Sequence, residues 1–158
     1  MQLTEQVAKH IREVFYGGNW TWVNLKDTLQ GISREQALAK QGSFNTIATL
    51  TYHIGYYVTA ILQVMRGQPL DASDKFSFTH PPLATEADWQ AMQQKIFTEA
   101  DELVLRVQAI PEARLWELFA EEKYGHIYRN LQGLVEHTHY HLGQIALLKK
   151  MQQGTEGV

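Results

Sequence analysis

The sequence predicts an all-α fold built from four long helices in a single domain of residues 1–158. Apolar residues recur at three- and four-residue steps along four long segments, which is the period of helices that bury one face. All four prolines fall between these segments, where they do not interrupt a helix. A chain of 158 residues is also a usual size for one domain with a real core.

The composition excludes several classes of protein. The chain is 44% hydrophobic and 20% charged, which is typical of a globular protein, and it contains no cysteine for disulfides or thiolate sites. The net charge of -3, without a basic block, argues against a nucleic-acid partner. No apolar run approaches the ~20 residues that span a bilayer, and no signal-peptide core is visible. We therefore expect a cytoplasmic protein with no membrane association.

The first long helix is predicted from about Thr4 to Tyr16, where a glycine pair ends it. A second piece, from Trp20 to Leu29, is expected to continue in the same general direction. Ser33 and Gln36 have the spacing of a capping box, in which each side chain bonds the other residue's backbone N–H. This box predicts a short helix that ends near Gly42.

The second long helix is predicted to begin at Ser43, a favourable N-cap residue, and to run to Arg66. The segment from Gly67 to Ala84 that follows contains three prolines and has no period. A loop of this length in a small helical protein is unusual, and such loops are often functional or cross from one end of the fold to the other.

The third long helix is predicted from Ala87 to about Gln108, after a capping box formed by Thr85 and Asp88. Pro111 closes this pattern, and the sequence PEARLWELF indicates a short helix. The last long helix is predicted from about His126 to Gln152, a stretch without proline in which the helical period is maintained.

Three histidines at alternate positions stand inside this last helix. On a strand His137, His139 and His141 would share one face, whereas on a helix only the outer two do, about 40° apart around the axis. The long helical period favours the second reading, so His139 is expected to face away. Two imidazoles one turn apart can chelate one divalent ion, but two ligands are too few for a tight site.

His53, in the middle of the second long helix, is a candidate third ligand if that helix packs against the last one. Three neutral imidazoles suit zinc, nickel, cobalt, copper or iron(II), and they leave coordination positions open, as catalytic sites do. The alternative is a set of core histidines that are hydrogen-bonded to their neighbours. The sequence contains no H-E-x-x-H motif, and it lacks the two E-x-x-H motifs of a di-iron bundle.

A histidine in the second helix, followed by H-x-x-x-H and then G-Q in the last, resembles the DinB-like superfamily of metal-dependent enzymes. The matching residues are His53, His137, His141, Gly143 and Gln144. The similarity extends over nearly the whole chain, and segments such as SFNTIATLTYHIGYY and KYGHIYRNLQGLVEHTHYHLGQIALLKK resemble one bacterial branch. Many relatives have an arginine where this chain has Leu142, so the role of that arginine is not carried over.

The resemblance implies a four-helix bundle with up-down-down-up topology, whose crossover is the long loop between the second and third helices. It also implies a divalent transition metal held by the three histidines, and a homodimer. Nickel and zinc are the leading candidates for the metal, ahead of iron, cobalt, copper and manganese. Relatives include S-transferases and isomerases that use low-molecular-weight thiols, so such a thiol is a candidate cosubstrate.

From these observations we expect a metal-dependent hydrolase or thiol S-transferase that acts on a small molecule. The alternative is a non-catalytic bundle, stabilised by the metal or by a dimer partner, with a stress-related or interaction role. Candidate pocket residues are Trp20, Tyr57, Tyr124, Asn130 and Gln144. Ligand imidazoles usually need an acceptor for their second N–H, and Glu136 and Asn45 are candidates for that role.

Overall fold

In the computed structural model, which describes residues 2–154, the regular secondary structure is helical, and the only β-type pairing is one isolated bridge between Leu118 and His126. The predicted all-α class is therefore confirmed. The elements are α1 (Leu3–Tyr16), α2 (Leu25–Leu29), α3 (Arg34–Leu38), α4 (Ile47–Met65), α5 (Asp74–Ser77), α6 (Glu86–Ala109), the 3-10 helices η1 (Glu112–Trp116) and η2 (Glu122–Tyr124), and α7 (Ile127–Gly154).

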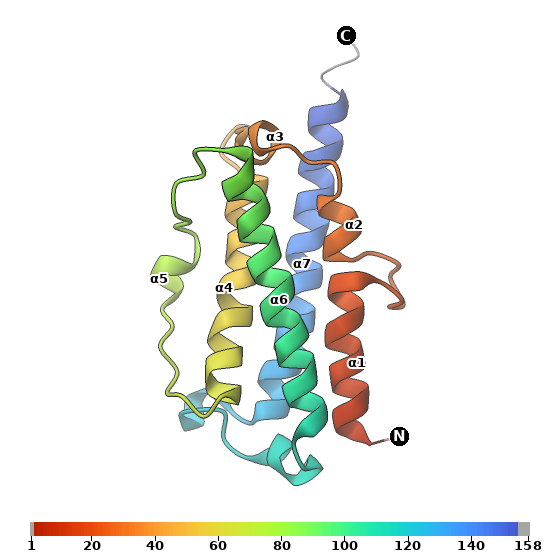
Figure 1. The fold of residues 1–158 in the computed structure, drawn as a ribbon, viewed down its shortest axis with the longest axis vertical. Coiled ribbons are helices and arrows are strands. Elements are labelled where there is room, and N and C mark those ends of the chain that lie inside the picture. The colour runs from red at the N-terminus through yellow and green to blue at the C-terminus, as the bar shows by residue number, and fades with distance from the viewer. Residues whose placement is uncertain (1, 155–158) are drawn as a thin grey trace.

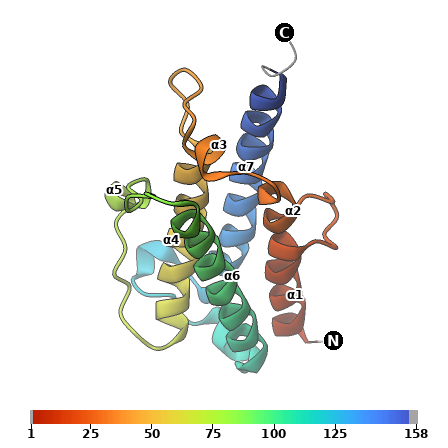
Figure 2. The same cartoon turned by 45° about the horizontal axis from the view of Figure 1, so that its top comes forward.

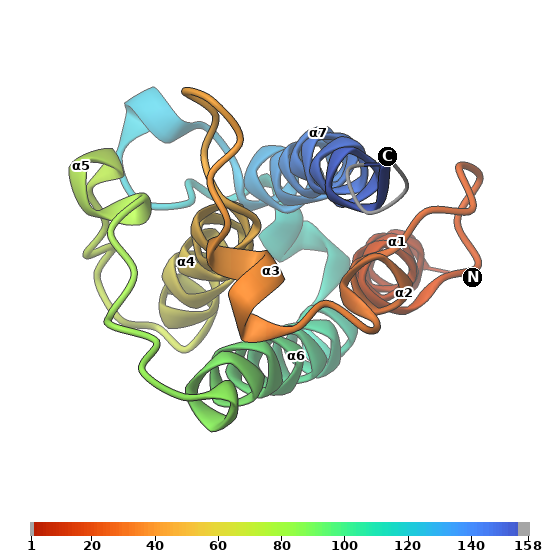
Figure 3. The same cartoon turned by 90° about the horizontal axis from the view of Figure 1, so that it is seen from above.

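The four long helices, α1, α4, α6 and α7, lie side by side around a common core. Each of α1 and α4 contacts both α6 and α7, an arrangement that is seen end-on in Figure 3. In Figure 1, α1 and α7 run upwards and α4 and α6 run downwards. Since α4 and α6 run in the same direction, the chain between them must return along the length of the molecule. This crossover, residues 66–85, carries α5 past the outer side of α4 (Figure 2).

The core between these helices is filled mainly by branched aliphatic side chains, with a few aromatic ones. The largest fully buried side chains are Trp89, Phe15, Ile11, Leu25, Ile47, Ile54, Leu62, Leu103, Leu115, Leu131, Leu142 and Ile145. Trp89 donates its indole N–H to the carbonyl oxygen of Ile32 at 2.8 Å, so its one polar atom is satisfied inside the core. None of the helices in the described part is long and apolar enough to cross a bilayer.

Both predicted capping boxes are present, and they fix the starts of α3 and α6. The Ser33 side chain accepts a hydrogen bond from the backbone of Gln36, and Thr85 accepts one from Asp88. In each box the later side chain bonds back to the capping residue, which satisfies two backbone donors at the helix end. Helix α6 begins one residue before the predicted start and ends one residue after the predicted end.

The predicted start of the second long helix at Ser43 is wrong. Helix α4 begins at Ile47, and Thr46 caps it by accepting a hydrogen bond from the backbone N–H of Thr49 at 3.1 Å. Ser43 is exposed in the preceding turn. Both residue types favour an N-cap, but Thr46 directly precedes the periodic apolar residues that pack into the core.

The piece from Trp20 to Leu29, which was expected to continue the direction of the first helix, is helical only from Leu25, with Asn24 as its cap. The side-chain oxygen of Asn19 accepts hydrogen bonds from both the backbone N–H and the hydroxyl of Thr21. Such local side-chain bonds compete with helix formation, and the chain forms an exposed loop before α2. This loop projects away from the other helices in Figure 3.

Four smaller details also differ from prediction. The short helix that Ser33 caps ends at Leu38 and not near Gly42. The segment PEARLWELF contains the 3-10 helix η1, and the predicted loop contains the one-turn helix α5. Helix α7 continues two residues past Gln152. Frayed ends and single turns of this kind leave little periodic signal in a sequence.

Helices α4 and α6 approach each other closely at Gly55. A Cβ atom placed there would lie 2.6 Å from Cγ1 of Ile96, far inside van der Waals contact. By contrast, a Cβ at Gly143 on α7 would meet nothing within 4 Å. The two glycines therefore differ in packing although both lie inside helices.

We expect Gly55→Ala to destabilise the protein by about 1–3 kcal/mol, because the new methyl group overpacks the contact with Ile96. Gly143→Ala should stabilise it by roughly 0.5–1 kcal/mol, since alanine is the better helix former and finds open space. Urea denaturation of both variants measures the two effects. Equal shifts in the same direction would contradict the close α4–α6 contact.

Candidate metal centre

Three histidine side chains from α4 and α7 meet between these helices. His137 Nε2 lies 2.9 Å from His53 Nε2 and 3.1 Å from His141 Nε2. Each residue offers one ligand atom, and the three atoms lie within 4.8 Å of one another. The predicted triad is thus brought together, because His53 is central in α4 and the other two are one turn apart on α7.

The third histidine of the alternating set faces elsewhere. His139 Nδ1 is 3.2 Å from the carbonyl oxygen of Val135, and its Nε2 is 3.2 Å from the hydroxyl of Thr21 in the α1–α2 loop. The helical interpretation of this segment is therefore confirmed, and His139 is not a member of the cluster.

The crossover fixes the orientation and the tautomer of His53. His53 Nδ1 is 2.9 Å from the hydroxyl oxygen of Ser77, which is buried at the end of α5. Ser77 donates its own proton to Asp74, either to the carbonyl oxygen at 2.8 Å or to Oδ1 at 3.1 Å. The Ser77 oxygen therefore accepts the proton of Nδ1, and His53 Nε2 presents its lone pair to the cluster.

The side-chain amide of Gln144, on the same helix, fixes the orientation and the tautomer of His141. His141 Nδ1 is 2.7 Å from Gln144 Oε1, and the amide nitrogen of Gln144 donates to the Tyr140 hydroxyl. A carbonyl-type oxygen only accepts, so Nδ1 of His141 carries the proton. Its Nε2 lone pair then also points toward His137. Both outer partners act as the acceptors that usually orient imidazole ligands of metals.

His137 lies between the other two rings, and its hydrogen-bonding partners show whether a metal ion fits at the centre. Its Nδ1 is buried and has no hydrogen-bond partner among residues 2–154. A neutral His137 has one proton to offer from Nε2, which cannot fully satisfy the lone pairs of both neighbours. A cation at the centre would accept the Nε2 lone pairs of all three rings, and imidazole nitrogens about 2.0–2.1 Å from a tetrahedral zinc lie about 3.3 Å apart. The donor set therefore fits a divalent transition metal.

Burial also keeps the three rings in the form that binds metal. Desolvation, with the neighbouring histidines, lowers the pKa of His137 to about 4. Burial is likewise the main cause that lowers the pKa of His53 and of His141. All three imidazoles are therefore neutral at neutral pH, as ligation requires.

Aromatic rings and a hydrogen-bonded carboxylate surround His53. The ring of Phe78, from the crossover, stacks on His53 with a centroid distance of 3.8 Å. Tyr57 packs edge-on against His53 and donates its hydroxyl to Asp74 Oδ1 at 2.8 Å. Burial and this bond raise the pKa of Tyr57 to about 12, and the bonds from Tyr57 and Ser77 lower the pKa of Asp74. Tyr57 is therefore protonated and Asp74 ionised.

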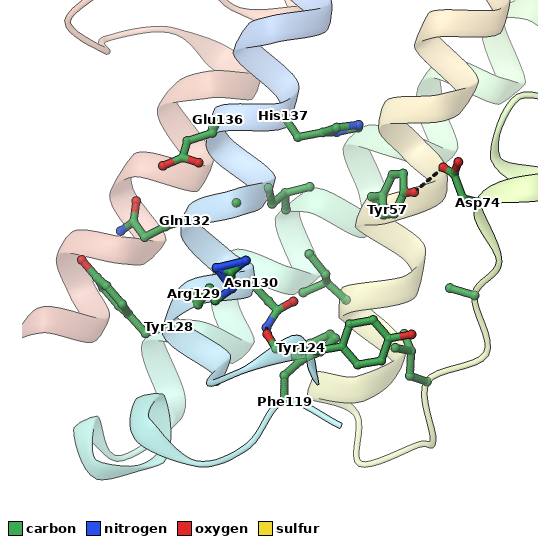
Figure 4. A pocket seen from close by; sticks show the side chains of 15 residues that line it. Tyr57, Asp74, Phe119, Tyr124, Tyr128, Arg129, Asn130, Gln132, Glu136 and His137 are labelled. Carbon is green, nitrogen blue, oxygen red and sulfur yellow. Dashed lines mark hydrogen bonds between the residues drawn. The ribbon is translucent and has the colours of Figure 1, made fainter. Parts of the chain in front are cut away.

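A cavity of about 670 Å³ begins at His137 and extends along the first half of α7, as Figure 4 shows. Its lining residues are Tyr57, Ile61, Leu70, Ala72, Asp74, Phe119, Tyr124, Tyr128, Arg129, Asn130, Gln132, Gly133, Leu134, Glu136 and His137. Three of the predicted pocket residues, Tyr57, Tyr124 and Asn130, are among them. The Asn130 amide donates to the backbone carbonyls of Tyr124 and His126, so it also secures the start of α7.

Two predicted pocket residues lie elsewhere. Trp20 is 94% exposed in the α1–α2 loop and does not line this cavity. Gln144 does not line it either, because its side chain is turned to His141. Leu142, at the position where many relatives carry an arginine, is fully buried in the core.

The predicted outer acceptors were also wrong. Glu136 and Asn45 are both exposed, and the observed acceptors are Ser77 and Gln144. Figure 4 shows Glu136 directed away from the His137 ring. The spacing of three residues between His141 and Gln144 on one helix could have identified Gln144. Ser77 gave no signal, because its position depends on the path of the crossover.

We expect the metal-free protein to lose stability as the pH falls from about 6.5 toward 4. Burial lowers the pKa values of the triad in the folded state, so in this range the unfolded chain binds more protons than the folded one. Urea denaturation across this range, with a chelator present, measures the slope. His137→Asn should flatten it, and His10→Asn, which removes an exposed histidine from α1, is the matched control. An unchanged slope in His137→Asn would contradict the burial effect.

Comparison with known proteins supports this description. No curated protein and no solved structure gives a significant match to the chain. The sequence model of the DinB superfamily matches residues 19–145, a range that includes all three histidines of the triad and Gln144. This match covers most of the chain, and the chain therefore belongs to the DinB superfamily.

Proposed function

We propose that this protein is a metal-dependent hydrolase or thiol S-transferase that acts on a small molecule, with His53, His137 and His141 as the metal ligands. The observation that supports this most directly is the convergence of three neutral imidazoles, two of them oriented by outer acceptors, at the end of a cavity. The family resemblance makes nickel and zinc the leading candidates, and imidazole donors suit both.

The bound ion would supply Lewis acidity, which lowers the pKa of a water or thiol placed beside it. Residues of the chain supply the other groups that the reaction needs. Asp74 lines the same cavity as His137 and is ionised, so we assign it as a hydrogen-bond acceptor that orients the nucleophile. The Tyr57 hydroxyl, bonded to Asp74, holds that carboxylate at the cavity wall.

The cavity favours catalysis over a purely structural metal. A structural zinc site is closed by four protein ligands, and in residues 2–154 the cluster of candidate ligands has three members. His137 also lines the cavity, so a small molecule in the cavity would lie beside an ion held by the triad. A non-catalytic bundle stabilised by metal would need a fourth ligand.

The arrangement of helices supports the finer fold assignment. We propose that α1, α4, α6 and α7 form an up-down-down-up four-helix bundle, in which residues 66–85 are the crossover. The homodimer and the thiol cosubstrate, both implied by family resemblance, stay predictions.

Replacing each histidine of the α7 set by alanine tests the ligand assignment. We expect His137→Ala and His141→Ala, like His53→Ala, to lose most of the metal, because two imidazoles are too few for a tight site. His139→Ala should keep it, since that ring bonds Val135 and Thr21 instead. Elemental analysis of the four folded variants after exposure to zinc or nickel gives the answer. An empty site in His139→Ala would require a different ligand set.

Ser77→Ala tests the role of the crossover in metal binding. It removes the acceptor that orients His53, and we expect the metal dissociation constant to rise by about 10- to 100-fold. Ser73→Ala is the matched control, because Ser73 lies on the same segment but contacts Tyr56 only through its backbone. Competition with a chromophoric chelator measures both constants. Equal affinities for the two variants would show that Ser77 does not support the site.

A further inference from the structure

The cavity beside the triad has two chemically different ends. His137 and Asp74 lie at one end, and Arg129 lies at the other, near the start of α7 (Figure 4). Arg129 and His137 are separated by two helical turns, which corresponds to about 12 Å along the axis. A molecule that reached both would therefore be extended.

The Arg129 guanidinium is a cation without an acidic partner. Within residues 2–154 no carboxylate lies within ion-pair distance of it, although Arg66, Arg106 and Arg114 each pair with a glutamate. Its stem packs over Gly125, where a Cβ would lie 3.0 Å from Arg129 Cδ. Gly125 has a φ of +70°, so glycine is favoured there on both grounds. Because Gly125 has no side chain, the stem of Arg129 can pack over it and lie at the cavity wall.

The wall between the two ends is largely apolar. Ile61, Leu70, Phe119 and Leu134 line it from four different segments of the chain. Gly133 lies on α7 between Arg129 and His137, and a Cβ there would meet nothing within 4 Å. A glycine inside a helix costs about 1 kcal/mol relative to alanine, and here it leaves the middle of the cavity open.

The charges along the cavity orient a bound molecule. Asp74 and Glu136 are at the level of His137, so in the metal-free protein a negative group is repelled from that end. It is attracted to Arg129, where the positive end of the α7 dipole adds to the potential. One guanidinium suits a single planar anion, whereas a dianionic phosphate would call for further cations.

We propose that the cavity binds an elongated small molecule whose carboxylate is held by Arg129 and whose apolar middle lies over Gly133. Its other end reaches His137, so this molecule is the substrate of the site. Only the conclusion that this molecule is the substrate rests on the proposed metal function. The contacts with its carboxylate and with its apolar middle do not involve the triad.

Calorimetric titration of the metal-free full chain tests this, with straight-chain carboxylates of increasing length and the alcohols of the same lengths. We expect each carboxylate to bind about five- to tenfold more tightly than its alcohol, as a charge-assisted bond at a partly exposed site gives. Arg129→Gln should remove this preference. Arg12→Gln, which removes an exposed arginine from α1, should retain it.

A second pair of variants tests the apolar middle. Gly133→Leu should abolish binding of both series, because its side chain fills the cavity, while Gly143→Leu on the same helix should leave binding unchanged. Equal affinity for carboxylates and alcohols, a preference that survives in Arg129→Gln, or no binding of any carboxylate would each overturn the proposal. Zinc binding by the same wild-type sample is measured separately. Its failure would remove the metal function and leave the carboxylate result standing.

Discussion

The hydrogen bonds on the outer side of the triad are the interactions on which this site depends. Three imidazoles buried between two helices could take many tautomers, and a buried polar atom without a partner is costly. Ser77 and Gln144 remove this freedom for two of the rings, because each accepts the Nδ1 proton and leaves the Nε2 lone pair facing inward. The convergence at His137 follows from those two contacts and from the packing of α4 on α7.

Elements with a strong local signal were predictable from the sequence. The long helices follow from apolar periodicity, and Ser33 and Thr85 mark helix starts because each has its capping partner three residues on. Prediction failed where two local signals competed. Ser43 and Thr46 are both capping residues, and the core packing of α4 decided between them. The hydrogen bonds of Asn19 with Thr21 hold a loop at the start of the piece that was expected to continue the direction of the first helix.

The triad itself was only partly accessible to sequence reasoning. The pair His137 and His141 follows from helical spacing alone, whereas His53 required the assumption that its helix packs against theirs. The cavity could not be predicted, because its walls come from α4, the crossover, the segment before η2 and α7. Neither could the role of Ser77, which lies 24 residues from His53 in sequence and reaches it only because the crossover passes α4.

The crossover has a consequence for how the length of this chain can vary. Loops generally tolerate inserted residues, because little depends on their exact path. Here the central part of the crossover is held in register with α4, since the Tyr56 hydroxyl bonds both backbone groups of Ser73 and the next turn carries Ser77 and Phe78 onto His53. Insertions are therefore compatible with the start of the crossover, near Gly67, where the chain is exposed. Between Ser73 and Phe78 a single added residue would rotate the one-turn helix and detach it from the triad.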